Sequence, residues 1–196
     1  MQEVIVDKHD RIGRIVFNRP AVKNALTPAM LDETIRAIAD LERDDDVRVV
    51  LITGAGGSFT SGGDLKFLAD LTQKKPFEIR NTVYTHFAGT AKAIKLCRKP
   101  TVAAVAGPAV GAGCEYAIAC DFRIAAESAA FCETWVHIGL MVPLGGMFLL
   151  PRLIGLGRAT DMLMRGTTVR GPEAERIGLV QGCVPDDQLD DAAMAL

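Results

Sequence analysis

The stretch GPAVGAGCEYAIACD, residues 107–121, decides the fold of this chain and raises the question of its chemistry. Glu115 is the carboxylate that follows its glycines, in a run dominated by small and apolar residues. An ionised carboxylate in apolar surroundings is costly unless it is paired, solvated or protonated. Glu115 therefore needs either a partner or a chemical task.

A structural role for Glu115 is also consistent with the pattern. A glutamate in the first turn of a helix is favoured by the helix dipole by about 0.3–1 kcal/mol. Such residues normally lie on the surface, whereas Cys114 and residues 116–119 predict a helix that is buried on most sides. The residues alone leave structure and catalysis equally open for Glu115.

Two glycine-rich turns lie next to this stretch. The apolar strands LITGAGG (51–57) and VAAVAG (102–107) each lead through such a turn into a helix, which is where α/β sheets usually bind ligands. The backbone N–H groups of Gly63 and Ala112 could converge there on one oxygen, as an oxyanion hole. The simpler interpretation, which spacing alone favours, is two tight turns that need glycine for positive φ.

The rest of the chain predicts one α/β domain over residues 1–196. A hairpin is expected at the N-terminus, followed by a helix that begins at Thr27 and Pro28. Further elements are expected in this order: a strand at 47–55, a helix after residue 63, a longer helical segment at 77–97, a strand at 99–107, short strands at 122–127 and 129–132, and helices near 145–155, 157–166, 172–178 and 186–196.

Composition excludes several classes of protein. The chain has 196 residues, 49% of them hydrophobic, and a net charge of −2 without a basic stripe, so nucleic acid is not an expected partner. The sequence contains neither a signal peptide nor a membrane span, and we expect a cytoplasmic protein with no membrane partner. Five cysteines without CxxC spacing predict buried free thiols and no metal site.

Other glycine-turn chemistries do not fit the sequence. GAGCEY has Tyr116 where a dinucleotide-binding turn needs its third glycine, and no G-x-S-x-G or phosphate-loop motif is present. Glu133 and His137 flank Trp135 at alternate positions. Polar residues with this spacing more often belong to a satisfied loop than to an active site.

Five motifs together resemble the enoyl-CoA hydratase/isomerase, or crotonase, family across nearly the whole chain: NRPAVKNAL (18–26), LITGAGGSFTSGGDLK (51–66), residues 99–131, LPRLIGLGRA (150–159) and EAERIGLV (173–180). The resemblance implies a crotonase-like spiral of ββα units that binds acyl-CoA thioesters. It also implies a homotrimer or hexamer. Coenzyme A would be part of the substrate, and no separate cofactor is expected.

The resemblance also implies roles for particular residues. Gly63 and Ala112 match the two oxyanion-hole donors, and Glu115 matches one of the two glutamates with which hydratases add water. The segments implied to meet coenzyme A are Ala21, Val22 and Lys23, in the adenosine turn, and Asp64, Leu65 and Lys66.

The sequence departs from the hydratase pattern at the second glutamate. That position holds Trp135, which can neither give nor take the required proton and is expected to contact substrate. Glu133 and His137 lie close by, on a segment expected to be β-like, and the sequence leaves their direction open. Tryptophan here also resembles the dehalogenase branch, but the nucleophilic aspartate of that branch falls on Pro143, which disfavours dehalogenation.

A second departure is length. Family members usually continue beyond this point with helices that close the acyl pocket, so we expect the C-terminal helical part to be missing or shortened. The apolar residues of DDAAMAL (190–196) are then expected to be exposed and to drive self-association.

Hydration of an enoyl-CoA is the leading interpretation. Isomerisation, decarboxylation or hydrolysis of an acyl-CoA through the same enolate are the alternatives, and a non-catalytic acyl-CoA binder is another, because the second carboxylate is missing. The sequence does not specify the acyl group.

Overall fold

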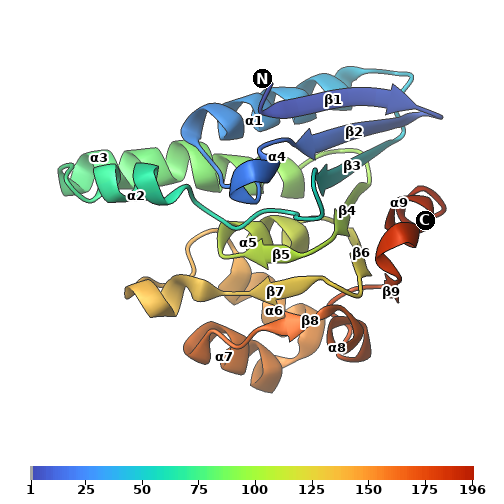
Figure 1. Cartoon of the computed structure of the whole chain (residues 1–196). Helices are drawn as coiled ribbons and strands as arrows, with labels where there is room; N and C mark the ends of the chain where they lie inside the picture. Colours follow the sequence, from blue (N-terminus) through green and yellow to red (C-terminus); the bar gives the residue numbers. More distant parts are fainter. Residues whose placement is uncertain (1) are drawn as a thin grey trace.

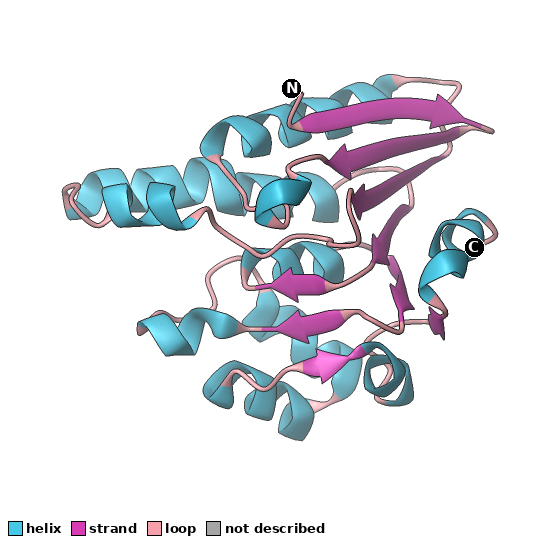
Figure 2. Cartoon of the chain, viewed as in Figure 1, coloured by secondary structure: helices cyan, strands magenta, loops and turns pink. Residues whose placement is uncertain are grey.

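The computed structural model describes residues 2–196 and contains two sheets with helices packed around them (Figures 1 and 2). The larger sheet has the order β1-β2-β3-β4-β6-β9 and is parallel except for the expected N-terminal hairpin of β1 and β2. Its strands are Val4–His9, Ile12–Phe17, Val49–Gly54, Thr101–Val105, Phe122–Ala126 and Gly182–Val184.

The smaller sheet has the order β5-β7-β8, with strands Pro108–Val110, Ala130–Cys132 and Val169–Arg170. The first strands, β1 to β3, all belong to the larger sheet, whereas each of the next two turns of the chain contributes one strand to each sheet before a helix. β4 and β5 lead into α5 (Ala112–Ala119), and β6 and β7 lead on to α6 (Gly146–Ile154) and α7 (Leu156–Arg165). This succession is the predicted spiral of ββα units, and Figure 1 shows it running down the molecule.

The helices of the N-terminal half of the chain agree closely with those predicted from the sequence. α1 (Pro28–Arg43) has Pro28 in its first turn, and the hydroxyl of Thr27 accepts a hydrogen bond from the N–H of Met30, as the capping pattern predicts. α2 is Leu65–Leu71. The predicted segment at 77–97 consists of α3 (Pro76–Thr82), a π-helical stretch over Val83–Ala88, and α4 (Gly89–Lys95).

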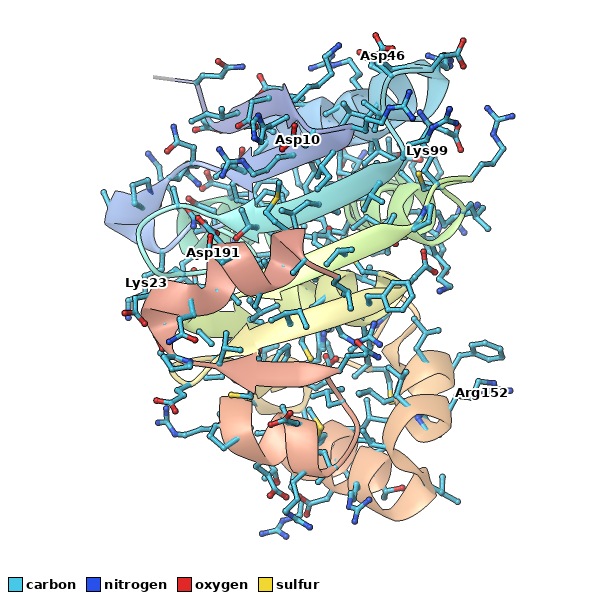
Figure 3. The ribbon with its side chains drawn as sticks, turned by 90° about the vertical axis from the view of Figure 1, so that its right-hand side faces the viewer. Asp10, Lys23, Asp46, Lys99, Arg152 and Asp191 are labelled. Atoms are coloured by element: carbon cyan, nitrogen blue, oxygen red, sulfur yellow. The ribbon has the colours of Figure 1, made fainter. Side chains whose placement is uncertain are left out.

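The C-terminal segment corrects one expectation. After α8 (Gly171–Arg176) and β9, the chain forms α9 (Leu189–Met194), which lies across one face of the larger sheet (Figure 3). Leu189 and Ala193 are buried against Leu51 and Val102 of that sheet. The segment is therefore packed rather than exposed, although the side chain of the last residue, Leu196, is accessible.

Helix α5 lies at the centre of the core, between α4, β5 and α6. All its residues are buried, including Glu115, as the composition of the stretch predicts. Its C-terminal end is held by Arg123 of β6, which is 1% exposed. The guanidinium donates Nη1–H to the Cys120 carbonyl at 2.6 Å and Nε–H to the Leu179 carbonyl at 2.8 Å.

Within residues 2–196, no helix has both the length and the apolar character needed to cross a bilayer. The same residues contain no group of three or more His, Cys, Asp or Glu side chains arranged to hold a metal ion.

Candidate active site

The two glycine-rich turns lie side by side, as their positions at neighbouring strand ends predict. The N–H of Thr60 donates to the Pro108 carbonyl at 2.9 Å, and the N–H of Val110 donates to the Thr60 carbonyl at 3.1 Å. This register pairs Thr60 with Ala109. The turns that carry Gly63 and Ala112 are therefore adjacent.

Close backbone approach explains why glycine is needed in both turns. A Cβ atom on Gly62 would lie 2.8 Å from the Val110 carbonyl oxygen, and one on Gly113 would lie 2.6 Å from the Thr60 Cγ2 atom. Gly62 and Gly111 also have φ of +88° and +54°, which favour glycine. The positive φ therefore falls on the residue before each candidate donor, so the turn and the donor interpretations are compatible.

The N–H groups of Gly63 and Ala112 are free of backbone acceptors among the described residues. Ala112 is the first residue of α5, so its N–H has no partner within the helix. Gly63 lies between two hydrogen bonds, from the Leu26 N–H to the Gly62 carbonyl and from the Asp64 N–H to the Leu26 carbonyl. Its own N–H is thus turned away from Leu26.

The segment implied to meet the adenosine part lies next to these donors. Residues Pro20–Val22 form a 3-10 turn, and Lys23 follows with φ of +50°. The N–H of Ser61 donates to the Lys23 carbonyl at 2.9 Å, which ties this turn to the chain just before Gly63. Ala21, Val22 and Lys23 are exposed, as a ligand-contacting turn requires.

The segment Asp64–Lys66 begins α2. The carboxylate of Asp64 caps the helix by accepting from the N–H groups of Lys66 and Phe67, and it pairs with Arg19 at 3.0 Å. The side chains of Leu65 and Lys66 are exposed, Leu65 to 82%. Asp64 is therefore a structural anchor, whereas its two successors are available at the surface.

Glu115 has backbone partners, which answers half of the question raised by its sequence. Its Oε2 atom accepts hydrogen bonds from the N–H groups of Leu144 and Gly146, both at 2.8 Å. Its Oε1 atom is buried and has no partner within residues 2–196. Burial raises the pKa of Glu115 above its ordinary value, and the two N–H donors oppose that rise.

A second buried carboxyl group, Glu133, lies close to the first. A Cβ atom on Gly146 would be 3.2 Å from Glu115 Oε2 and 3.3 Å from Glu133 Oε1, so the two carboxyl groups flank the same glycine. Glu133 is 0% exposed, and neither of its oxygens has a partner among the described residues. Burial, together with the charge of Glu115, raises the pKa of Glu133.

The local structure determines where the side chains of Glu133 and His137 point, which the sequence left open. The segment expected to be β-like leaves β7 at Cys132 and turns into a 3-10 helix over Thr134–Ile138. Glu133 therefore points into the core, while His137 is exposed and hydrogen-bonds through Nε2 to the Arg165 carbonyl at 3.2 Å. The alternation of polar residues predicted a satisfied loop, and His137 fits that prediction whereas Glu133 does not.

Trp135 lies between the carboxyl groups and the second glycine turn. A Cβ atom on Gly111 would touch the indole ring at 3.7 and 3.8 Å. The indole N–H is buried and lies close enough to both carboxyl groups to favour their ionised forms, against the larger effect of burial on each pKa. It does not have the geometry of a full hydrogen bond to either.

The buried side-chain nitrogen and oxygen atoms that lack a partner in residues 2–196 all belong to this site: Glu115 Oε1, Glu133 Oε1 and Oε2, and Trp135 Nε1. Buried polar groups are nearly always paired, and such exceptions call for an explanation. A surface hollow lined by Ile5, Arg14 and Asp186 lies elsewhere and includes none of these three residues. The unpaired atoms, rather than the hollow, mark the site.

Many known proteins are similar to this chain in sequence and in structure. The enoyl-CoA hydratase/isomerase family matches residues 7–196. The chain is 38% identical to a probable enoyl-CoA hydratase of Mycobacterium tuberculosis over 194 residues, covering 99% of this chain and 73% of that protein. It is 36% identical to a crotonyl-CoA hydratase of Syntrophomonas wolfei over 189 residues, with coverage of 96% and 71%.

Solved structures agree with the sequence comparison. An enoyl-CoA hydratase from Bacillus anthracis superposes with a TM-score of 0.93 at 35% identity, covering 99% of this chain and 74% of that one. An enoyl-CoA hydratase from Polaromonas gives a TM-score of 0.92 at 29% identity, with coverage of 98% and 74%. This chain therefore belongs to the enoyl-CoA hydratase/isomerase family and has the crotonase fold.

Proposed function

We propose that this protein is an enoyl-CoA hydratase, which adds water across the double bond conjugated to an acyl-CoA thioester. The observation that carries the proposal is Glu115, a buried carboxyl group with one free oxygen, next to two glycine turns with free N–H groups. The names of the relatives support the same reaction class.

The two turns would act on the thioester carbonyl. The N–H groups of Gly63 and Ala112 would hold its oxygen and stabilise the enolate that forms when water attacks the β-carbon. Loss of one donor from such a hole typically costs about 3–4 kcal/mol of transition-state stabilisation. Glu115 would orient the water and accept its proton, because two N–H donors already favour its ionised form.

The surface beside the donors would hold coenzyme A. The turn Ala21–Lys23 is exposed and tied to the chain before Gly63, which suits contact with the adenosine part. Leu65 and Lys66 are exposed immediately after the donor. Trp135, against the other turn, would contact the acyl group near the reacting carbons.

Assembly as a homotrimer or hexamer is also proposed. Large apolar side chains are exposed along residues 138–164, on the 3-10 helix, the loop that follows it, α6 and α7, among them Leu140 and Met141 of the loop and Phe148 of α6. These elements contact one another, and exposed apolar side chains on them favour association. Sedimentation as a monomer at micromolar concentration would contradict this.

Turnover of crotonyl-CoA, followed as loss of conjugated absorbance, tests the proposed reaction. We expect hydration by the wild-type chain and formation of the 3-hydroxyacyl thioester. Binding of coenzyme A esters without turnover of any member of an enoyl-CoA panel would instead identify a non-catalytic binder.

A further inference from the structure

Water addition needs two proton transfers, and Glu115 supplies a group for only one of them. A base must take a proton from the attacking water, and an acid must give a proton to the α-carbon. Among the described residues, the buried side-chain atoms that lack partners belong to two carboxyl groups and one indole. The indole N–H is not acidic enough to serve as the proton donor.

We propose that Glu133 is the second catalytic residue of this protein, the acid that protonates the α-carbon, while Glu115 is the base. The inference rests on the proposed hydratase function. Its basis is geometry: both carboxyl groups flank Gly146, both are buried, and both oxygens of Glu133 are unpaired within residues 2–196.

The division of roles follows from the hydrogen bonds around each group. Glu115 accepts from two backbone N–H groups, and such donors stabilise a carboxylate. Glu133 has no such donor and lies beside Glu115, so ionisation of both at once is disfavoured. The titratable groups facing Glu133, besides Glu115, are the thiols of Cys114 and Cys132, whose pKa values burial raises, so they remain neutral.

The reaction balances with one water molecule. The water oxygen bonds to the β-carbon as Glu115 takes a proton from it, and the electron pair of the double bond moves toward the thioester oxygen as an enolate. The enolate then collapses as the α-carbon takes the proton of Glu133. One hydrogen and one hydroxyl have been added, and the proton now on Glu115 restores Glu133 before the next turnover.

A purely structural role for Glu133 makes different predictions. A neutral buried acid that only fills space could be replaced by glutamine with no change in rate or in the pH profile. A catalytic acid cannot, because an amide cannot deliver the proton. Activity alone would not separate these roles if folding changed, so binding and pH dependence are measured as well.

The test compares Glu133→Gln with Glu127→Gln, a matched control. Glu127 is exposed on the turn between β6 and β7, outside the site. For crotonyl-CoA hydration we expect Glu133→Gln to lower kcat by roughly 10²–10⁴-fold with little change in the Kd of butyryl-CoA, while the control keeps full activity. We expect the wild-type rate to fall at alkaline pH as Glu133 ionises, and this fall should disappear from the residual activity of Glu133→Gln.

A second variant, Glu133→Asp, keeps the test possible if Glu133→Gln does not fold. Glu133→Asp keeps an acid but draws it back by one methylene, so it should lose rate yet retain the alkaline fall. If both variants, or the folded one of the two, turn over like the control, Glu133 is structural and the inference is overturned while the hydratase function stands. If the wild-type chain itself hydrates no enoyl-CoA, the proposed function fails and this inference with it.

Discussion

The candidate site has two halves, one formed by backbone groups and the other by side chains. On one side, the segments 62–64 and 111–113 present backbone N–H groups, and glycines that cannot be enlarged fix their approach. On the other side, Glu115, Glu133 and Trp135 present side chains around Gly146 and Gly111. By the resemblance drawn from the sequence, the backbone half matches the family pattern at Gly63 and Ala112, whereas the side-chain half departs from it at Trp135.

This difference shows which part of the chemistry the fold itself provides. In the proposed reaction, stabilisation of the enolate would need only two N–H groups in fixed positions, which the two glycine turns would supply. Proton transfer needs an acid and a base, and these can be supplied from different positions on neighbouring elements. The second carboxyl group can therefore come from the residue before the 3-10 helix instead of from within it.

The largest effect is expected in the side-chain half, from Glu115→Gln. The amide oxygen can still accept from the N–H groups of Leu144 and Gly146, so the fold should be preserved. Turnover should fall by about 10²–10⁴-fold while the Kd of a product coenzyme A ester changes little. Near-full turnover by the folded variant would make Glu115 a structural residue.

A somewhat smaller effect is expected in the backbone half, from Gly62→Ala. The added Cβ would lie 2.8 Å from the Val110 carbonyl oxygen, and relief of this contact displaces the adjoining N–H of Gly63. Displacement of one donor should lower kcat by about 10²–10³-fold. The variant keeps both carboxyl groups, so its pH profile should retain the wild-type shape.

Gly57→Ala is the matched control for that variant. Gly57 also has positive φ, +68°, but a Cβ there meets no atom within 4 Å. It should lose about 1 kcal/mol of stability from backbone strain and keep its activity. Equal activity losses in the two variants would mean that strain, not donor position, is responsible.

The last effect concerns stability rather than rate, and it again distinguishes the side-chain half from the backbone half. The folded-state pKa of Glu133 is raised, so between its unfolded and folded values the native state holds more protons, and its stability falls as pH rises. Each unit of difference contributes about 1.4 kcal/mol. Glu133→Gln should therefore gain stability relative to wild type as pH increases from about 5 to about 8, measured by denaturant unfolding.

The raised pKa of Glu115 contributes to the same fall of stability with pH. In Glu133→Gln, the slope of the unfolding free energy against pH should therefore be reduced rather than abolished. Gly62→Ala offers the contrast, because it changes no titratable group and should leave the slope intact. Parallel pH dependence in wild type and Glu133→Gln would show that Glu133 titrates alike in the folded and unfolded chain.

Much of the backbone half could be predicted from the sequence, because glycine placement and apolar strands are local signals. The N-terminal hairpin, the Thr27 cap and the burial of α5 follow from residues that are neighbours in the chain. Glu133 could not be placed, because its direction depends on a helical turn that begins immediately after it. The signal that the sequence offers is its position directly after Cys132 and two residues before Trp135.

The exposure predicted for the apolar residues of the C-terminal segment is wrong for a related reason. The residues of α9 have few large apolar side chains, and their burial depends on the exposed face that the larger sheet offers them. That face is assembled from β3, β4 and β6, which lie far from α9 in sequence. No pattern within residues 190–196 can therefore predict that they pack against this sheet.

The position of Arg123 has a consequence for the order in which the chain matures on the ribosome. One of its carbonyl acceptors, Cys120, precedes it by three residues, whereas another, Leu179, follows it by 56. Until residue 179 has been synthesised and has left the exit tunnel, the Nε–H of this cation lacks its native acceptor, and burying a charged group with an unpaired donor is unfavourable. We therefore expect the core around the C-terminal end of the helix that carries Glu115 to close late in synthesis, after Leu179 has emerged.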